Sequence, residues 1–387
     1  MKLTQYGDYF YLYILLITFI PAIFLGLLGR KPRYYGIIAS IVMILIILGR
    51  DIGLKLFLIF FLGETFVIYT YLFIRRKTDN KYVYFLFLFF SMLPLLITKI
   101  SGVTRYASII GFIGLSYISF KAIQMVIEIF DERITKINGV TYLYFLIFFP
   151  TFSSGPIDRW KRFEDNINTK IQAKEYFDEY LFEGIKKIFL AILYKFVIAY
   201  LIDTYWLLKI PADMTMLNII NYMYAYTMYL FFDFAGYSLF AIGTSYIFGI
   251  KTPENFNKPF ISKDMKEFWT RWHISLSRWF GDYIFSRFVL NSMRKKRFKN
   301  RFIASHVAQI ITMFVMGLWH GFTPYYILYG LYQGGALVLT DMYQRKSKYY
   351  KKHKKEKWFQ YTQIVITFHI VCFGMLIFSG YLFKGVD

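Results

Sequence analysis

Residues 82–100 read YVYFLFLFFSMLPLLITKI and contain Lys99 as their single charged side chain. A helix needs roughly 20 consecutive apolar residues to cross the hydrocarbon core of a bilayer. In lipid the backbone must also satisfy its own N–H and C=O groups, which a helix does within one segment. These residues are therefore predicted to form a transmembrane helix.

Similar apolar segments occur along the whole chain of 387 residues, of which 57% are hydrophobic and 18% are charged. That charge is too sparse for the surface of a soluble domain of this size. We predict an all-α polytopic membrane protein with one membrane domain over 1–387. The run at 217–249 exceeds one crossing and predicts two segments with a break near Gly236 or Gly243, whereas the short run at 140–154 predicts a re-entrant segment. The expected spans are 9–29, 35–50, 53–74, 82–100, 107–130, 181–203, 217–249, 303–320, 322–341 and 358–383.

The net charge of +22 lies mostly in short basic runs between the apolar segments. Lys and Arg are retained on the cytoplasmic side of membrane proteins. Runs at 30–33 and 75–81 flank a two-span hairpin, which predicts an extracellular N-terminus, and runs at 294–301 and 345–357 flank the hairpin 303–341 in the same way. No nucleic-acid recognition motif accompanies this charge. Membrane lipid and an acidic protein partner both fit it.

Residues 251–301 differ from the rest because charges interrupt their aromatic character. Turn residues at 253–259 precede an amphipathic helical pattern that runs from Ser262, as N-cap, to about Ser292. On a continuous helix, residues three and four apart share a face. That face would hold Trp269, His273, Ser277 and Phe280.

Two histidines are candidate site residues. His273 lies in this amphipathic segment, and His320 lies between two apolar runs, with Gly317 and Gly321 beside it. Ionisable groups at membrane depth are costly and usually mark a site or a water-filled cavity, although a hydrogen-bonded packing role is the alternative for each. His, Cys, Asp and Glu residues do not recur at metal-ligand spacing, so no metal site is expected.

Two further polar features leave alternatives open. Asp233 lies in an apolar run, where it either orients a polar group or caps a broken helix. A polar stripe on one expected span consists of Tyr117, Lys121, Gln124 and Glu128, and such a stripe must face the bundle interior or water. Within it, Lys121 and Glu128 either mark a site or are structural partners of each other.

An apolar patch lies beside dense positive charge at the end of the amphipathic segment. Val289, Leu290 and Met293 precede a basic run that includes Arg294 and Arg297. This combination suits docking of a small acidic protein, because charge steers association and apolar contact holds the complex. It equally suits an interfacial helix on anionic lipid.

The sequences WTRWHISLS at 269–277 and MGLWHG at 316–321 resemble the signature of the bacterial membrane-bound O-acyltransferases. Segments 153–159, 233–238, 255–260 and 373–380 agree with that resemblance, which extends over nearly the whole chain. In particular the chain resembles the branch of the family that transfers D-alanyl groups. One departure is Gly281, where many relatives carry an Arg.

The resemblance implies a ring of about 10–12 transmembrane helices around a thinned core with a tunnel. It implies that His320 is the catalytic residue and that His273 is the second histidine of the site. Within this expectation, 251–301 carries His273, the hairpin 303–341 carries His320, and the tunnel residues are Trp269, Ser277, Trp319 and Asp233.

The resemblance also implies the partners. A D-alanyl group would arrive as a phosphopantetheine thioester on a small acidic cytoplasmic carrier protein, so this chain would bind no cofactor of its own. Teichoic acid outside the cell is the expected final acceptor, with other membrane proteins of the pathway as partners and the immediate acceptor left open. There are two alternative interpretations. One is a polysaccharide O-acetyltransferase of the same family, and the other is a transporter or channel lined by the same polar residues. The expected docking residues for the carrier are Val289, Leu290, Met293, Arg294 and Arg297.

Overall fold

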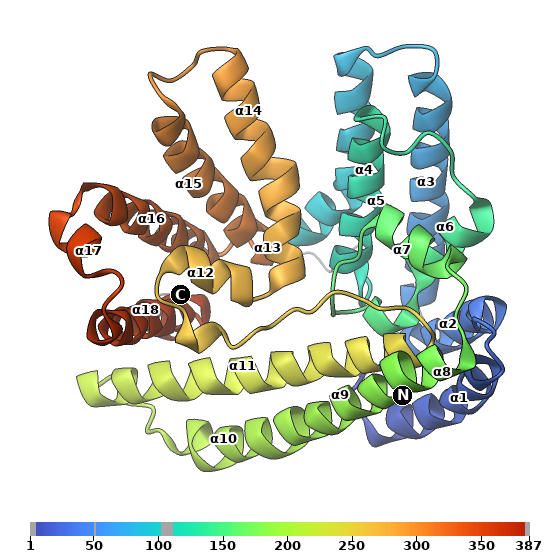
Figure 1. Ribbon diagram of the computed structural model, residues 1–387, viewed down its shortest axis with the longest axis horizontal. Coiled ribbons are helices and arrows are strands. Elements are labelled where there is room, and N and C mark those ends of the chain that lie inside the picture. The colour runs from blue at the N-terminus through green and yellow to red at the C-terminus, as the bar shows by residue number, and fades with distance from the viewer. Residues whose placement is uncertain (1–4, 50–51, 102–110, 384–387) are drawn as a thin grey trace. The chain divides into compact units, whose positions relative to one another are not determined.

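The computed structural model describes residues 5–49, 52–101 and 111–383, and every regular element within them is helical (Figure 1). This confirms the all-α prediction. The chain forms two compact units. Unit 1 comprises Met1–Leu193 and Gly236–Pro253, and unit 2 comprises Tyr194–Ala235 and Glu254–Asp387.

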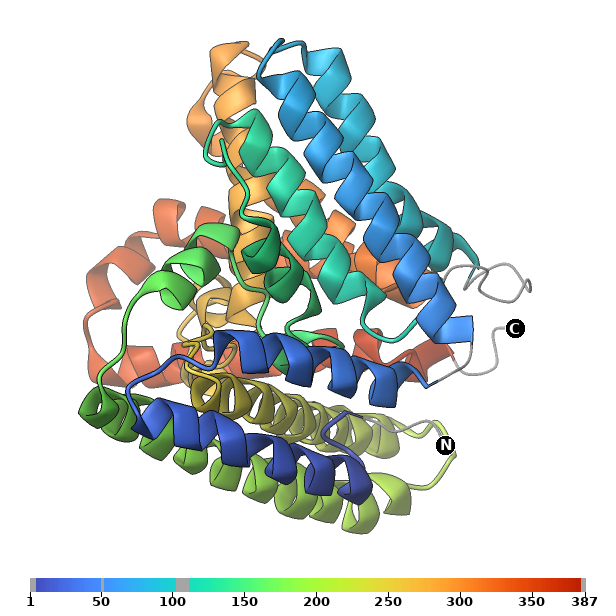
Figure 2. The same ribbon diagram turned by 90° about the vertical axis from the view of Figure 1, so that its right-hand side faces the viewer.

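Unit 1 contains the first nine helices of the described residues and the end of α11. Within it α3, α4 and α5 pack side by side, as Figure 2 shows in blue to teal. The expected span 107–130 begins in residues outside the described range, and its described part is α5. The helices are α1 (Tyr9–Leu27), α2 (Arg33–Leu48), α3 (Ile52–Arg75), α4 (Lys81–Ser101), α5 (Leu115–Phe130), α6 (Gly139–Ile147), α7 (Trp160–Asn168), α8 (Ala173–Glu175) and α9 (Phe182–Ile192).

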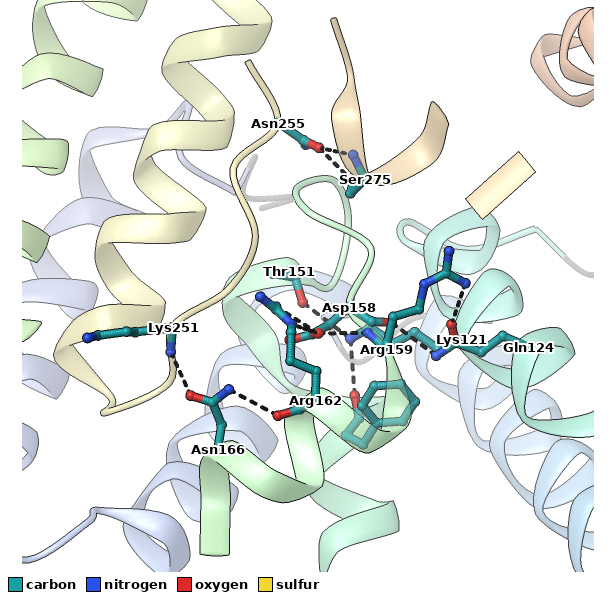
Figure 3. Close-up of polar contacts among 11 residues, drawn as sticks. Lys121, Gln124, Thr151, Asp158, Arg159, Arg162, Asn166, Lys251, Asn255 and Ser275 are labelled. Carbon is teal, nitrogen blue, oxygen red and sulfur yellow. Dashed lines mark hydrogen bonds and ion pairs between the residues drawn. The ribbon is translucent and has the colours of Figure 1, made fainter. Parts of the chain in front are cut away.

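The polar stripe on α5 faces the interior of unit 1, as predicted, and joins a buried polar network (Figure 3). The Lys121 ammonium donates to the carbonyl oxygen of Phe145 at 3.1 Å and to the Thr151 hydroxyl at 3.2 Å. Gln124 donates to the Asp158 carbonyl at 3.0 Å, and the Asp158 carboxylate pairs with Arg162 at 2.7 Å. The cation therefore satisfies the Phe145 carbonyl in the last turn of α6 and also bonds to the 3-10 turn at Phe149–Thr151 that follows.

Unit 2 contains both candidate histidines. Its largest contact joins α15 to α16, and α18 packs along α16. Its helices are α10 (Tyr200–Tyr205), the first part of α11 (Met216–Ile247), α12 (Met265–Arg271), α13 (Ile274–Phe280), α14 (Ser286–Arg294), α15 (Arg301–His320), α16 (Pro324–Lys346), α17 (Lys348–His353) and α18 (Lys357–Phe378).

Six helices of the described residues are long and apolar enough to cross a membrane: α1, α3, α4, α11, α15 and α18. The shorter α2 is also apolar. The chain is therefore a membrane protein with several apolar helices. Helix α16 has sufficient length but carries Gln333, Asp341 and Gln344 along it.

The predicted break in 217–249 is wrong, because α11 continues through both Gly236 and Gly243. At Gly243 the glycine instead serves helix packing within unit 1. A Cβ at Gly243 would lie 2.7 Å from the carbonyl oxygen of Gly184, and a Cβ at Gly184 would lie 2.9 Å from that of Gly243. The two glycines thus allow α9 and α11 to approach closely, as small residues do in membrane bundles.

The α15–α16 hairpin depends on the same kind of contact. A Cβ at Gly317 would lie 2.4 Å from the carbonyl oxygen of Tyr326, and a Cβ at Gly330 would lie 2.5 Å from that of Met313. Neither position has room for a side chain. The close approach of the two helices fixes the end of α15, where His320 lies.

We predict that Gly330→Ala destabilises the protein by about 1–3 kcal/mol, the usual cost of overpacking a well-packed contact. The matched control is Gly335→Ala on the same helix, where an added Cβ meets nothing within 4 Å. Replacing that helical glycine should be neutral or stabilising by up to about 1 kcal/mol. Thermal unfolding in detergent measures both effects, and equal unfolding temperatures for the two variants would show that the hairpin contact is not tight.

Candidate active site

His273 lies at a break between two short helices rather than within one. Helix α12 ends at Arg271, α13 begins at Ile274, and His273 adopts the left-handed conformation with φ 44° and ψ 52°. The predicted continuous helix from Ser262 is therefore wrong, and its N-cap is Asp264, whose side chain accepts from the Glu267 N–H at 2.8 Å. A non-glycine residue in this region costs about 1–3 kcal/mol and persists only where its surroundings impose it.

The constraint on His273 comes from the turn-rich segment before it. The Asn255 carbonyl accepts from the Ile274 N–H at 2.9 Å, and its side-chain oxygen accepts from the Ser275 hydroxyl at 2.6 Å and N–H at 3.2 Å (Figure 3). On the other side of the break, the Asn257 N–H donates to the Arg271 carbonyl at 2.9 Å. The hydrogen bonds of Asn255 and Asn257 thus fix the chain on both sides of the break. We call this set of hydrogen bonds the Asn255 clamp.

The His273 ring is 5% exposed and packs edge-on against Phe234, with ring centroids 4.8 Å apart. Burial lowers the pKa of His273 well below its ordinary value, so the ring is neutral at pH 7. A neutral imidazole has one N–H donor and one acceptor nitrogen. Among the described residues neither nitrogen has a hydrogen-bond partner. Because buried polar atoms are rarely unpaired, these nitrogens are available to a substrate or to water.

His320 ends α15 among aromatic rings. Phe378 of α18 meets it edge-on with centroids 4.8 Å apart, and Tyr326 and Tyr329 of α16 lie at 5.6 and 6.2 Å. The ring is only partly buried. Packing against α16 and α18 therefore orients the imidazole and leaves part of it accessible.

A cavity of about 130 Å³ lies between the helical segments that lead to the two histidines. Its lining includes Trp269, one turn before His273, and Met316, one turn before His320. We call it the α13–α15 cavity. The structure thus brings together two of the predicted tunnel residues, Trp269 and Ser277, although the His273 side chain is not in the lining. The remaining lining residues are Phe280, Gly281, Phe285, Gln309, Thr312, Met313 and Leu337.

Three residues of this lining have buried polar atoms without a partner among the described residues. They are the Trp269 indole nitrogen, the Gln309 side-chain oxygen and the Thr312 hydroxyl. Together they offer a donor, an acceptor and a group that can act as either. Gln309 and Thr312 were not among the predicted site residues. Their spacing of three residues in the largely apolar part of the span after His306 was the signal that could have identified them.

The other two predicted tunnel residues are placed differently. Asp233 forms an ion pair with Lys195 within unit 2. Since α11 is unbroken, Asp233 does not cap a broken helix and instead orients a polar group. Trp319 is adjacent to His320, with ring centroids 4.5 Å apart, and is not part of the cavity lining.

The predicted docking residues on α14 divide between two faces. Val289 is 7% exposed and packs inward, whereas Leu290 and Met293 are 59% and 40% exposed. Arg294 and Arg297 are exposed beside them. We call Leu290, Met293, Arg294 and Arg297 the α14 patch. Val289 contributes to packing rather than to this surface.

Residues 50–383 match the model of the membrane-bound O-acyltransferase family. The chain therefore belongs to that family and is an acyltransferase, in agreement with the resemblance in its sequence. It is 42% identical to a teichoic acid D-alanyltransferase of Bacillus subtilis over 98% of each chain, and 42% identical to one of Streptococcus thermophilus over 98% of this chain and 96% of that one. A probable alginate O-acetylase of Pseudomonas aeruginosa is 32% identical over 69% of this chain and 48% of that protein.

We predict that Asn255→Ala destabilises the protein by about 1–3 kcal/mol, because the buried Ser275 N–H and hydroxyl lose their acceptor. Acyl transfer should fall as well, since His273 loses its orientation. The control is Asn257→Ala, which is exposed and keeps its backbone bond to Arg271. Thermal unfolding and transfer rates test this, and equal effects of the two substitutions would contradict the role of the Asn255 side chain.

Proposed function

We propose that this acyltransferase moves a D-alanyl group from the phosphopantetheine thioester of an acidic cytoplasmic carrier protein toward teichoic acid outside the membrane. The relatives named teichoic acid D-alanyltransferase match nearly the whole chain, which supports the acyl group and the acceptor. The observation that carries the proposal is the α13–α15 cavity, with its three unpartnered polar atoms between the two histidine-bearing segments.

The chemistry of the cavity suits the donor arm. A pantetheine chain contains two amides and ends in sulfur, so it needs hydrogen-bond partners once it leaves water. The Trp269 N–H can donate to an amide oxygen, the Gln309 oxygen can accept from an amide N–H, and the Thr312 hydroxyl can do either. Met313 and Met316 supply apolar walls that adapt to a thin flexible chain.

In the proposed reaction an acceptor hydroxyl oxygen attacks the thioester carbonyl carbon, an ester bond forms and the carbon–sulfur bond breaks. His320 takes the hydroxyl proton and returns it to the departing sulfur, which suits an imidazole near neutral pH. Neutral His273 donates its ring N–H to the carbonyl oxygen, where negative charge develops in the transition state. The aromatic surroundings of His320 limit the access of water, which would otherwise hydrolyse the activated ester.

Basic residues support an orientation for this transfer. The runs 294–301 and 345–357 lie at the two outer ends of the α15–α16 hairpin and would both be cytoplasmic. Helix α15 has 20 residues, which corresponds to about 30 Å. His320 would then lie toward the exterior, and the α14 patch would face the cytoplasm. The runs at 30–33 and 75–81 support an extracellular N-terminus by the same rule.

We predict that His320→Ala lowers transfer of labelled D-alanine from the loaded carrier by about 100- to 10,000-fold, the usual contribution of a general base. Carrier binding should be unchanged. His369→Ala is the control, because that ring is exposed and contacts the Val365 carbonyl of its own helix at 2.7 Å. Full transfer by His320→Ala would refute the role of His320. A wild-type protein that accepts an acetyl donor but not D-alanyl carrier would refute the proposed donor.

Docking of the carrier is tested at the exposed part of α14. We expect Leu290→Asp to weaken carrier binding by about 1–3 kcal/mol, the range for losing an interface anchor. Arg294→Glu should mainly slow association and reduce its salt dependence. Because Val289 is buried, Val289→Asp would disturb packing and is not a clean test. Binding kinetics at two salt concentrations measure these effects, and unchanged binding of Leu290→Asp would place the carrier elsewhere.

A further inference from the structure

A groove follows α16 and α18 in unit 2, separate from the site described above. Its volume is about 580 Å³, and it shares no lining residue with the α13–α15 cavity. Gly335, Ala336 and Leu339 of α16 line one wall, and Ile366 and Ile370 of α18 line the other. This volume lies within the range of small-molecule sites. A transmembrane helix, about 10 Å across and about 30 Å long, is too large to lie within it.

One end of the groove is polar, and Lys263 and Asp264 both line it. The Glu267 carboxylate accepts from the Lys263 backbone N–H at 2.9 Å and interacts electrostatically with the Lys263 charge. Both neighbouring carboxylates also have other partners, so they balance the positive charge at this end only in part. Asp264 accepts from the Gln344 side chain at 2.7 Å, and Glu267 pairs with Arg271 at 2.7 Å.

A dense basic stretch lies at the same end. Residues 345–357 contain eight Lys or Arg and a single carboxylate, Glu356. Phe359 lines the groove and also packs against Tyr349 and Tyr350 of α17, with centroids 5.7 and 6.1 Å apart. These contacts hold the basic helix α17 against the groove.

We propose that this groove binds one anionic phospholipid of the cytoplasmic leaflet. One acyl chain lies along the apolar walls, and the phosphate lies at Lys263 and the basic stretch. Basic pockets between transmembrane helices on the cytoplasmic side recognise anionic headgroups in this way. A zwitterionic lipid fits the apolar walls equally well, but its headgroup gains less electrostatic binding free energy from the cations. Asp264, the N-cap of α12, lines the same end of the groove, so the bound headgroup would lie beside the start of the helix that leads to His273.

The test compares phosphatidylglycerol with phosphatidylcholine as additives in thermal unfolding of the detergent-solubilised full chain. A ligand that binds only the folded state raises the unfolding temperature. In Gly335→Phe the new ring enters the groove, because a Cβ there meets nothing within 4 Å. The matched control is Gly63→Phe on α3, where the Cβ is equally free.

We expect phosphatidylglycerol to raise the unfolding temperature of wild type and of Gly63→Phe more than phosphatidylcholine does, and this difference to vanish in Gly335→Phe. A combined substitution of Lys351, Lys352, Lys354 and Lys355 by Gln leaves the groove intact. It should raise the phosphatidylglycerol concentration for half-maximal stabilisation by at least about tenfold. If Gly335→Phe does not fold, the lysine variant still tests whether the basic stretch contributes to binding of the anionic lipid.

Three results would overturn the proposal. The first is equal stabilisation of wild type by the two lipids. The second is a phosphatidylglycerol effect that survives both Gly335→Phe and the lysine substitutions. The third is a co-purified polypeptide that wild type retains and Gly335→Phe loses, which would make the occupant a protein segment.

Discussion

The candidate site depends on the hydrogen bonds that Asn255 accepts from Ile274 and Ser275, the two residues after His273. They hold His273 in a left-handed conformation that the residue would not adopt alone. That conformation ends α12, begins α13 and turns the following helix so that Ser277 and Gly281 line the α13–α15 cavity. Without the clamp the amphipathic pattern would favour a continuous helix. The close approach of α15 and α16 at Gly317 and Gly330 fixes the position of His320 in the same way.

The cluster of positive charge and His320 lie at opposite ends of α15. The cations lie at the start of α15 and the end of α16, where they can attract an acidic protein or anionic lipid. His320 lies at the opposite end of α15 among aromatic rings, and His273 is buried and neutral. Under the proposed function, this separation would let the surface steer partners electrostatically while the two histidines remain in a less hydrated environment.

The sequence predicted the helical class and the interior position of Lys121 and Gln124, because length, hydropathy and periodicity are local properties. It failed where distant residues decide the local structure. The break at His273 depends on bonds from Asn255, and the continuity of α11 depends on Gly184 opposite Gly243. Val289 and Leu290 are adjacent in sequence and equally apolar, so only the packing of α14 distinguishes the buried one from the exposed one. Gln309 and Thr312 belong to the candidate site through the cavity that they line, which depends on the packing of α13 against α15.

The most direct test of the central claim is disulfide trapping of the donor arm in the α13–α15 cavity. Gly281→Cys places a thiol in the lining where a Cβ meets nothing within 4 Å, and Cys372→Ser removes the single native, fully buried cysteine. With a mild chemical oxidant added to take up the two electrons, we expect a mixed disulfide between this cysteine and the pantetheine thiol of the unloaded carrier. No such product should form with a carrier that lacks the pantetheine arm, or with Gly63→Cys in the same background. A carrier that binds normally but forms no disulfide at position 281 would contradict the account.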